Sequence, residues 1–323
     1  MPGVLLADLG GTNLRLARVE LASLVNPSLS AIGQIQNFQD QASDPYAYFA
    51  QCAAGYHDVE YALIALAGPV SNQLASVTAR QWQIDAQAMA KALKVKKVHL
   101  INDFPAQAMA VPYLDSHEIL SIHHSWQAPS NTQPRTLVCG PGTGLGVSVL
   151  HALDHGFYAQ ATEAGHSHFS AVTDFDWFVS QFFSTKYGRA SWERLISGQG
   201  LADLHQAFAQ HHNQEIKAIM PAELTQLAHQ GDALATQVVE YFVHLLGRFA
   251  GDMVLTHGAT GLMLAGGVYS HLHPLVNTDV LLNSMQDKGR FSDYLANIPV
   301  AMNTCKSPGL LGAMALAKEV FYQ

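Results

Sequence analysis

The chain has 323 residues, of which 49% are hydrophobic and only 13% are charged, and its formal net charge is −8. This composition is typical of a well-packed globular protein and excludes a disordered chain. The acidic balance and the lack of any Lys/Arg cluster argue against a nucleic-acid-binding surface. The length suits about two domains.

The cysteines and the apolar runs predict a cytoplasmic protein with no membrane anchor. Cys52, Cys139 and Cys305 are far apart and form no CxxC pair, so we expect neither a disulfide framework nor a zinc knuckle. No basic stretch with a long apolar region opens the chain, and no apolar run approaches the ~20 residues of a membrane span. The 17 histidines are scattered, and pairs such as His123-His124 lie in polar context, which favours solvated loops over a metal site.

A strand, a glycine turn and a second strand are predicted near the amino terminus. An apolar run at residues 4–7 leads into residues 8–13, Asp-Leu-Gly-Gly-Thr-Asn, and an alternating run at 14–19 leads out. Two glycines let backbone N–H groups approach a ligand, and Asp8 places a carboxylate at the strand end. Together they suit a phosphate chain and its magnesium ion. From these residues alone, an ordinary hairpin is an equally good interpretation.

Predicted strands and helices alternate through the next hundred residues, which indicates an α/β fold. Apolar runs predict buried strands at 61–67 and 97–101, and the second ends at Asn102 and Asp103. Open α/β sheets bind ligands at the carboxyl ends of their strands, so these two residues are candidates for a site. We also expect a strand at 31–38, a helix at 46–54 after an Asp44-Pro45 cap, a helix from the Asp85 cap through Met89 and Leu93, a helix at 105–111, and a polar surface excursion between domains at 115–134.

A second strand–glycine turn–strand unit follows, with predicted strands at 136–139 and 147–150. Between them, residues 140–146 read Gly-Pro-Gly-Thr-Gly-Leu-Gly. Four glycines in seven residues exceed what a structural turn needs, which favours contact with phosphate. Neither glycine turn is a Walker A loop, because the closing Gly-Lys-Ser/Thr is absent. The repeated unit predicts two similarly built halves.

Carboxylates and histidines in the next segment are further candidates. Glu163 and His166 have no evident third metal ligand, and the HExxH spacing is absent. His168 alternates with His166, so we expect both to point the same way along a strand. Residues 191–198 predict a short capped helix, in which Glu193 by itself reads as a first-turn carboxylate favourable to the helix dipole.

The last third of the chain predicts a core helix, a strand and a final helix. Apolar residues at helical spacing predict a helix from 232 to about 255. A strand at 262–265 ends at Gly266-Gly267, where contact with a nucleotide and simple chain reversal are equally good local interpretations. The final helix is expected at 310–320.

Taken together and in order, these segments resemble the bacterial glucokinase family, which belongs to the sugar kinase/Hsp70/actin superfamily of ATPases. The similarity covers nearly the whole chain. The resemblance implies a two-lobed α/β fold of the actin-like, ribonuclease H-like ATPase type, with mixed sheets flanked by helices and the active site in the interlobe cleft. We expect a small domain of residues 1–112 plus 303–323 and a large domain of residues 113–302. The segments that carry the resemblance are 8–13, 102–104, 140–146, Glu163 with His166, Glu193, 265–268, 288–291, 303 and 308–312.

The resemblance implies an ATP-dependent hexose 6-phosphotransferase that converts D-glucose to glucose 6-phosphate, feeds glycolysis and forms a homodimer. Asp103 would be the catalytic base, and Asp8 would hold Mg²⁺ directly or through water. This replaces the local interpretations of Glu193 and of the Gly266-Gly267 turn. The implied glucose ligands are Asn102, Asp103, Glu163, His166 and Glu193. The implied ATP-binding residues are Ala7, Asp8, Leu9, Gly10, Gly11, Thr12, Gly142, Thr143, Gly144, Gly266 and Gly267.

Two departures from the family pattern bear on the choice of sugar rather than on the reaction. Ala164 stands where the family often has glycine, and Ala79 stands where asparagine is expected. The alternatives are a kinase for another hexose on the same scaffold, a non-catalytic sugar sensor or regulator, and an actin- or Hsp70-like ATPase with a protein partner. Sugar-sensing regulators usually carry an added DNA-binding helix-turn-helix. We expect none here, because the first strand is predicted to begin by about residue 3. The CxCGxxGC zinc segment of the related ROK kinases is missing, which argues against membership of that sister family. Glucose and ATP are therefore the expected partners, with no nucleic acid and no membrane.

Overall fold

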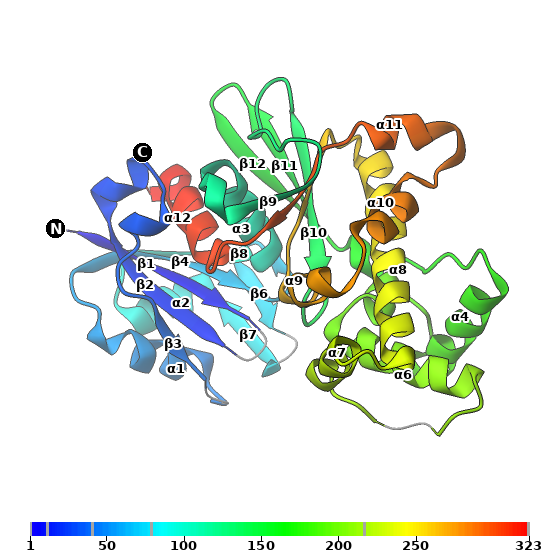
Figure 1. Cartoon of the computed structure of the whole chain (residues 1–323). Coiled ribbons are helices and arrows are strands. Elements are labelled where there is room, and N and C mark those ends of the chain that lie inside the picture. Colours follow the sequence, from blue (N-terminus) through cyan, green and yellow to red (C-terminus); the bar gives the residue numbers. More distant parts are fainter. Residues whose placement is uncertain (1, 11–12, 40–41, 78–79, 216–217, 322–323) are drawn as a thin grey trace. The chain divides into compact units, whose positions relative to one another are not determined.

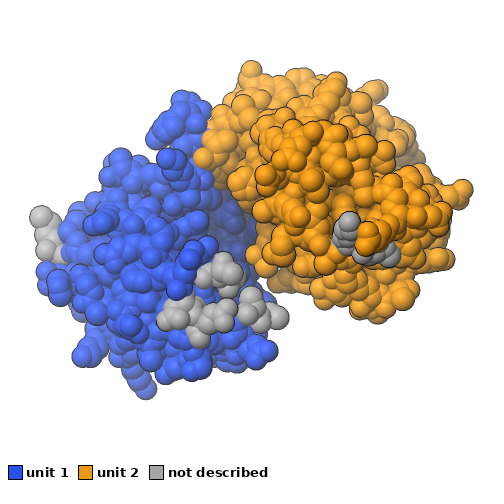
Figure 2. Space-filling model, turned by 60° about the horizontal axis from the view of Figure 1, so that its bottom comes forward, with its two compact units in different colours: residues 1–118, 150–161, 305–323 blue, residues 119–149, 162–304 orange. Residues whose placement is uncertain are grey.

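The computed structural model describes residues 2–10, 13–39, 42–77, 80–215 and 218–321. The chain forms two compact units, shown in different colours in Figure 2: unit 1 comprises residues 1–118, 150–161 and 305–323, and unit 2 comprises residues 119–149 and 162–304. This division differs from the expected domains mainly by including residues 150–161 in unit 1. The expected boundaries remain a prediction.

Unit 1 is built on a mixed five-stranded sheet in the order β3-β2-β1-β4-β8 (Figure 1). β1 pairs antiparallel with β2 and parallel with β4, and β4 pairs parallel with β8. The predicted amino-terminal hairpin is therefore confirmed. The predicted strand at 31–38 is wrong over its first part, because Leu29–Ala31 forms a 3-10 turn and only three residues pair with β2. The strands are β1 (Gly3–Leu9), β2 (Leu14–Glu20), β3 (Gln36–Phe38), β4 (Val59–Leu66) and β8 (Lys97–Asn102).

Strand β1 is buried on both faces, because helices cover both sides of the sheet. Leu5 and Leu9 belong to a core shared with Phe49 of α1 (Pro45–Cys52) and with α2 (Ala86–Leu93). The alternating residues Val4 and Leu6 belong to the core on the other face, with α12 (Pro308–Phe321). The alternation follows from the two-residue period of a strand.

The predicted starts of the helices after Asp44 and Asp85 are confirmed by their caps. The Asp44 carboxylate accepts the N–H of Tyr46 at 2.9 Å, ahead of Pro45, and the Asp85 carboxylate accepts the N–H of Ala88 at 2.7 Å. Such caps satisfy N–H groups that have no partner within the helix. A small antiparallel sheet, which the sequence did not predict, lies between β4 and α2 in the chain: β5 (Val70–Ser71), β6 (Leu74–Val77) and β7 (Trp82–Asp85).

The second sheet has the order β12-β11-β10-β13-β14-β9. β10, β13 and β14 are parallel, and β9 pairs antiparallel with β14. The first five strands repeat the order of the first sheet, namely a meander on one side of a central strand and two parallel strands on the other. Two similarly built halves are thus confirmed, although β9 interrupts the predicted excursion at 115–134. The strands are β9 (Ile119–His123), β10 (Arg135–Pro141), β11 (Leu145–Leu153), β12 (Gly156–Thr162), β13 (Gly261–Leu264) and β14 (Val300–Asn303).

Helix α8 (Ala233–His257) confirms the predicted core helix, and the Asp232 carboxylate caps its first turn. It packs against α6 (Gly198–His211), α7 (Pro221–His229) and α10 (Thr278–Gln286). Gly247 lets α10 approach closely, because a Cβ there would overlap the carbonyl oxygen of Leu281. No helix in the described ranges is both long and apolar enough to span a membrane. The other helices are α4 (Asp174–Tyr187), α5 (Trp192–Leu195), α9 (Gly267–Leu272) and α11 (Ser292–Ala296).

The crossing of α12 and α3 (Asp103–Ala110) in unit 1 gives a stability prediction (Figure 1). A Cβ at Gly312 would overlap the backbone carbonyl oxygen of Ala106, so the two helices must separate in Gly312→Ala. Overpacking of this kind costs about 1–3 kcal/mol, and we expect urea unfolding to show that loss. Gly55→Ala is the control, because a Cβ there meets no atom within 4 Å. Equal stability of the two variants would contradict the prediction.

Candidate active site

The candidate residues of unit 1 lie at one edge of its sheet. Leu9 at the end of β1 is in register with Leu66 of β4, and Leu66 is in register with Asn102 of β8. Neighbouring strands lie ~4.8 Å apart, so the backbones of Leu9 and Asn102 are about 10 Å apart. Asp8 and Asp103, next to them in the chain, therefore lie at the same carboxyl edge of the sheet.

The side chain of Asn102 makes two hydrogen bonds that fix the position of Asp103. Its Oδ1 accepts the N–H of Phe104 at 3.0 Å, and its Nδ2 donates to the carbonyl of Gly68 at 2.9 Å. Asn102 is thus the cap of α3, and Asp103 is its first residue. The predicted helix at 105–111 begins two residues early for this reason. The positive end of the helix dipole favours the ionised form of a carboxylate in this position.

Asp8 is a shielded carboxylate. Its side chain is 14% exposed, and its Oδ2 lies 3.3 Å from Nη1 of Arg15, which faces it across the hairpin. Burial raises the pKa of the Asp8 carboxyl, although Arg15 acts in the opposite direction. Gly309 in the first turn of α12 packs against it, since a Cβ there would lie 2.7 Å from Oδ2. The single contact with Arg15 therefore offsets only part of the free-energy cost of burying the Asp8 charge.

The rest of the first glycine turn is described only in part. The N–H of Gly10 donates to the carbonyl of Asn13 at 2.9 Å, and a Cβ at Gly10 would have no contact closer than 3.8 Å. Ala7 and Leu9 are fully buried, so neither offers a side chain to a ligand. The predicted ATP residues Gly11 and Thr12, and the departure at Ala79, lie outside the described residues.

In unit 2, packing explains some of the glycines at the strand ends. A Cβ at Gly140 would overlap the carbonyl oxygen of Ala265, and one at Gly266, which has φ +85°, would overlap that of Pro141. These two glycines let the turns after β10 and β13 lie side by side. A Cβ at Gly142 or at Gly267, in contrast, meets no protein atom within 4 Å. Those two positions are open to a ligand.

The second glycine turn is closed by its own backbone and by α6. The N–H of Gly142 donates to the carbonyl of Gly144 at 2.8 Å, and the N–H of Gly198 donates to the carbonyl of Gly142 at 2.9 Å. Thr143 at the tip is exposed. Gly144 packs on Glu193, because a Cβ there would lie 2.5 Å from Glu193 Oε2.

Three predicted sugar ligands come together next to this turn and form a polar row, defined as Glu163, His166 and Glu193. Glu163 Oε2 lies 3.7 Å from His166 Nε2, and His166 Nδ1 lies 3.6 Å from Glu193 Oε1. The other oxygen of Glu193 accepts the N–H of Leu145 at 3.1 Å. Glu193 lies in the first turn of α5, as its local pattern indicated, and it also connects the polar row to the glycine turn.

The expected strand through His166 and His168 is wrong. Ala164–His166 is a 3-10 turn, closed by the N–H groups of His166 and Ser167 on the carbonyls of Glu163 and Ala164. The turn presents the exposed His166 side chain beside the two carboxylates. His168 instead forms an isolated bridge with Ser191 and does not join the polar row.

A buried charge network that the sequence did not predict supports the loop after the polar row. Arg248 Nη1 lies 2.8 Å from Asp176 Oδ2, its Nη2 donates to the carbonyl of Ser170 at 2.6 Å, and Tyr241 donates to Asp176 Oδ1 at 2.6 Å. Burial by itself raises the pKa of Asp176. The hydrogen bonds from Tyr241, the Val172 N–H and Arg248, together with the Arg248 charge, outweigh burial and lower it overall.

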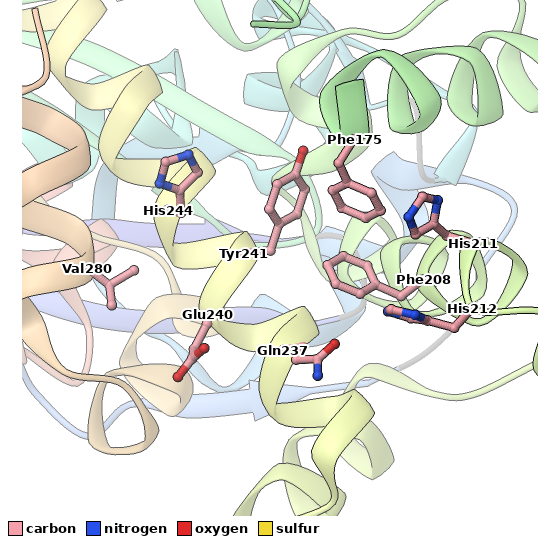
Figure 3. A pocket seen from close by; sticks show the side chains of 9 residues that line it. All are labelled: Phe175, Phe208, His211, His212, Gln237, Glu240, Tyr241, His244 and Val280. Atoms are coloured by element: carbon pink, nitrogen blue, oxygen red, sulfur yellow. The ribbon is translucent and has the colours of Figure 1, made fainter. Parts of the chain in front are cut away.

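The ring of Tyr241 also forms part of the wall of a separate hollow of about 500 Å³ (Figure 3). This hollow contains none of the predicted site residues. It is lined by Phe175, Phe208, His211, His212, Gln237, Glu240, Tyr241, His244 and Val280.

The described residues contain no group of three or more His, Cys, Asp or Glu side chains that could hold a metal ion by themselves. A Mg²⁺ ion bound beside Asp8 would therefore have to take most of its ligands from bound phosphate groups and water, as Mg²⁺ usually does in proteins.

Comparison with known proteins identifies the family. A family model described as glucokinase matches residues 5–320. The chain belongs to the glucokinase family. It is 35% identical to a glucokinase of Xylella fastidiosa over 325 aligned positions, which cover 98% of this chain and 95% of that protein.

Solved glucokinase structures confirm the predicted α/β fold class. The structure of a glucokinase from an Antarctic psychrotroph superposes with a TM-score of 0.80 at 26% identity, covering 99% of both chains. A glucokinase from Balamuthia mandrillaris, solved in complex with glucose, superposes with a TM-score of 0.84 at 20% identity, covering 98% of this chain and 94% of that one.

The buried network predicts a specific acid dependence. The folded pKa of Asp176 lies below its unfolded value, so its contribution to stability is present above about pH 4 and is lost as the pH falls through the folded pKa. Asp176→Asn should lower the free energy of unfolding at pH 7 by about 3–5 kcal/mol, because it leaves Arg248 buried without a counter-charge.

The same variant should lose less stability than the wild type between about pH 5 and pH 3, as measured by urea unfolding at each pH. Asp174→Asn, an exposed first-turn residue of the same helix, is the control and should follow the wild type. Parallel acid profiles for wild type and Asp176→Asn would contradict the assignment.

Proposed function

We propose that this chain transfers the γ-phosphoryl group of ATP to the 6-hydroxyl of glucose, with Asp103 as the general base. Membership of the glucokinase family makes it a glucose-phosphorylating kinase. The observation that carries the site assignment is the bond from the Leu145 N–H to Glu193, because it joins a polar row suited to a polyol to a glycine turn suited to phosphate.

The sugar side of the proposal rests on hydrogen-bonding capacity. Glu163 and Glu193 offer two carboxylates, each within 3.7 Å of the His166 imidazole, which suits neighbouring hydroxyl groups. We assign Asn102 and Asp103 to the same glucose molecule. A site of this kind rejects analogues that lack a hydroxyl, because its polar groups would remain unpaired.

The phosphate side rests on the glycines that packing does not explain. Gly142 and Gly267 have open space where a side chain would stand, and a Cβ at Gly10 would make only an ordinary contact at 3.8 Å, so a phosphate or a nucleotide can approach these backbones. The remaining residues assigned to ATP in this proposal are Ala7, Asp8, Leu9, Gly11, Thr12, Thr143, Gly144 and Gly266.

Asp8 fits a magnesium site by its chemistry. A shielded carboxylate with a raised pKa and one arginine contact would regain its ordinary ionisation beside a divalent cation. We propose that Asp8 holds Mg²⁺ directly or through water. The ion, when bound, neutralises charge on the phosphate oxygens. A homodimer and the expected division into residues 1–112 plus 303–323 and 113–302 are proposals that rest on the family resemblance. A cytoplasmic location is a proposal that rests on the scattered cysteines.

The chemical step needs positioning more than covalent chemistry. Asp103 is held by the Asn102 cap at the first position of α3, and it would accept the proton of the attacking hydroxyl in line with the γ-phosphate. Closure around the substrates would exclude water, which otherwise competes as the phosphoryl acceptor.

Removal of the proposed base gives the main test. Asp103→Ala should lower kcat by roughly 10²–10⁴ at unchanged fold, the usual range for a general base. At 1.36 kcal/mol per decade this corresponds to about 3–5.5 kcal/mol. Kinetics in a coupled assay and circular dichroism check the two parts. Asp279→Ala, which removes a first-turn carboxylate after the Asn277 cap of α10, should leave kcat unchanged. Near-wild-type turnover of Asp103→Ala would remove Asp103 from this role.

The polar row makes a separate prediction for sugar binding. Glu163→Gln keeps the shape of the side chain but removes its charge, and charged hydrogen bonds contribute about 1.5–3 kcal/mol. We expect the KM for glucose to rise by roughly 10- to 100-fold while the KM for ATP stays the same. An unchanged KM for glucose would show that Glu163 is not a sugar ligand.

A further inference from the structure

The carbonyl of His166 is bound by an arginine side chain from a distant part of the chain. Arg189, between α4 and α5, donates from Nη2 to the His166 carbonyl oxygen at 2.8 Å. His166 is the last residue of the 3-10 turn Ala164–His166. The turn is closed internally by N–H groups, so its contact with the segment before α5 determines where the imidazole lies.

Two backbone bonds join the same pair of segments. The N–H of Trp192 donates to the carbonyl of Ser167 at 3.0 Å, and the N–H of Phe169 donates to the carbonyl of Ala190 at 3.1 Å. The Arg189 side chain adds a third bond, at the end of this contact nearest to the polar row. It is the one of the three that a side chain makes, so a substitution can remove it without altering the backbone.

The segment that carries Arg189 also carries Glu193, so His166 is contacted from two directions. Glu193 Oε1 lies 3.6 Å from the imidazole, and Arg189 binds the backbone carbonyl of the same residue. An imidazole whose two polar contacts, with Glu193 and Glu163, lie at 3.6 and 3.7 Å is poorly fixed by its side chain alone, since a hydrogen bond needs about 3 Å. The backbone of His166 must therefore determine the orientation of the imidazole.

We propose that Arg189 is a positioning residue for glucose recognition, which acts by holding His166 in the polar row. The inference rests on the proposed function, because it takes Glu163, His166 and Glu193 as the sugar ligands. It adds a residue that touches no substrate and that no motif in the sequence singles out. Arg189 is exposed, so its replacement leaves the core intact.

The test compares Arg189→Ala and Arg189→Lys with a matched control. Loss of the bond in Arg189→Ala should raise the KM and the Kd for glucose about fivefold, as expected for one hydrogen bond. The kcat, the KM for ATP and the melting temperature should stay at wild-type values. Arg189→Lys keeps a donor but loses the planar fork, so we expect an intermediate KM.

Arg135→Ala is the matched control. Arg135 is another exposed arginine of unit 2 that donates to a backbone carbonyl, from Nε to Gly258 at 2.9 Å, but it lies at the start of β10, at the opposite end of that strand from the glycine turn. Its loss should leave the KM for glucose unchanged. A rise equal to that of Arg189→Ala would mean that any lost surface bond weakens sugar binding, and would overturn the proposal.

A double-variant cycle separates this proposal from the function on which it rests. If Arg189 acts through His166, then Arg189→Ala adds nothing to the Kd for glucose in a His166→Ala background, and additive effects would overturn the proposal. An unchanged Kd in Glu163→Gln and in His166→Ala would instead overturn the sugar assignment itself. A raised Kd in those two variants with a wild-type Kd in Arg189→Ala would overturn the positioning role alone. Titration of tryptophan fluorescence with glucose measures the Kd without turnover.

Discussion

The register of parallel strands is the constraint on which the candidate residues of each unit depend. In unit 1, Leu9, Leu66 and Asn102 are in one row, so the strands that carry Asp8 and Asp103 end together. In unit 2, Cys139 is in register with Leu264, and the glycine turn after β10 therefore lies beside Gly266 after β13. A slip of one residue would reverse the faces of a whole strand and separate these groups.

Glycines have two separate physical roles at these strand ends. Gly140 and Gly266 are required because backbone atoms of a neighbouring turn occupy the place of a side chain. Gly142 and Gly267 have no such neighbour, and the proposed contact with a nucleotide would give a reason for them. The abundance of glycine in residues 140–146 thus has two causes. The number of glycines in the sequence does not separate these two roles, so all of them were interpreted as phosphate contacts.

Local signals in the sequence were sufficient for caps, hairpins and the long buried elements. Asp44 and Asp85 indicated where α1 and α2 begin, because a cap binds N–H groups that lie within the next few residues of the sequence. Helix α4 was missed because its aromatic residues, such as Phe175, Trp177 and Phe178, do not keep to one face, so no helical period is visible. β9 and β14 were missed because each is short and is stabilised by its neighbours in the sheet.

For the site, residue types were predictable and contacts were not. The resemblance to a family identified Glu163, His166 and Glu193 as belonging together. No local pattern shows that Glu193 binds the N–H of Leu145, 48 positions away, or that Arg248 pairs with Asp176, 72 positions away. Such contacts are set by tertiary packing. The exposed Arg189 carries even less signal, since surface arginines are common and few of them support a binding residue.

The last helix of the chain has a consequence for folding during synthesis. One face of β1 is covered by α12, so Val4 and Leu6 at the start of the chain have no complete core until residues 308–321 have been made. Most of the residues that form unit 2 leave the ribosome before that point, and their core does not require α12. The unit that contains the amino terminus is therefore the last to close, contrary to the usual order of domain folding from the amino terminus. Until then one apolar face of its central strand has no cover from α12, and exposed apolar surface of this kind favours aggregation.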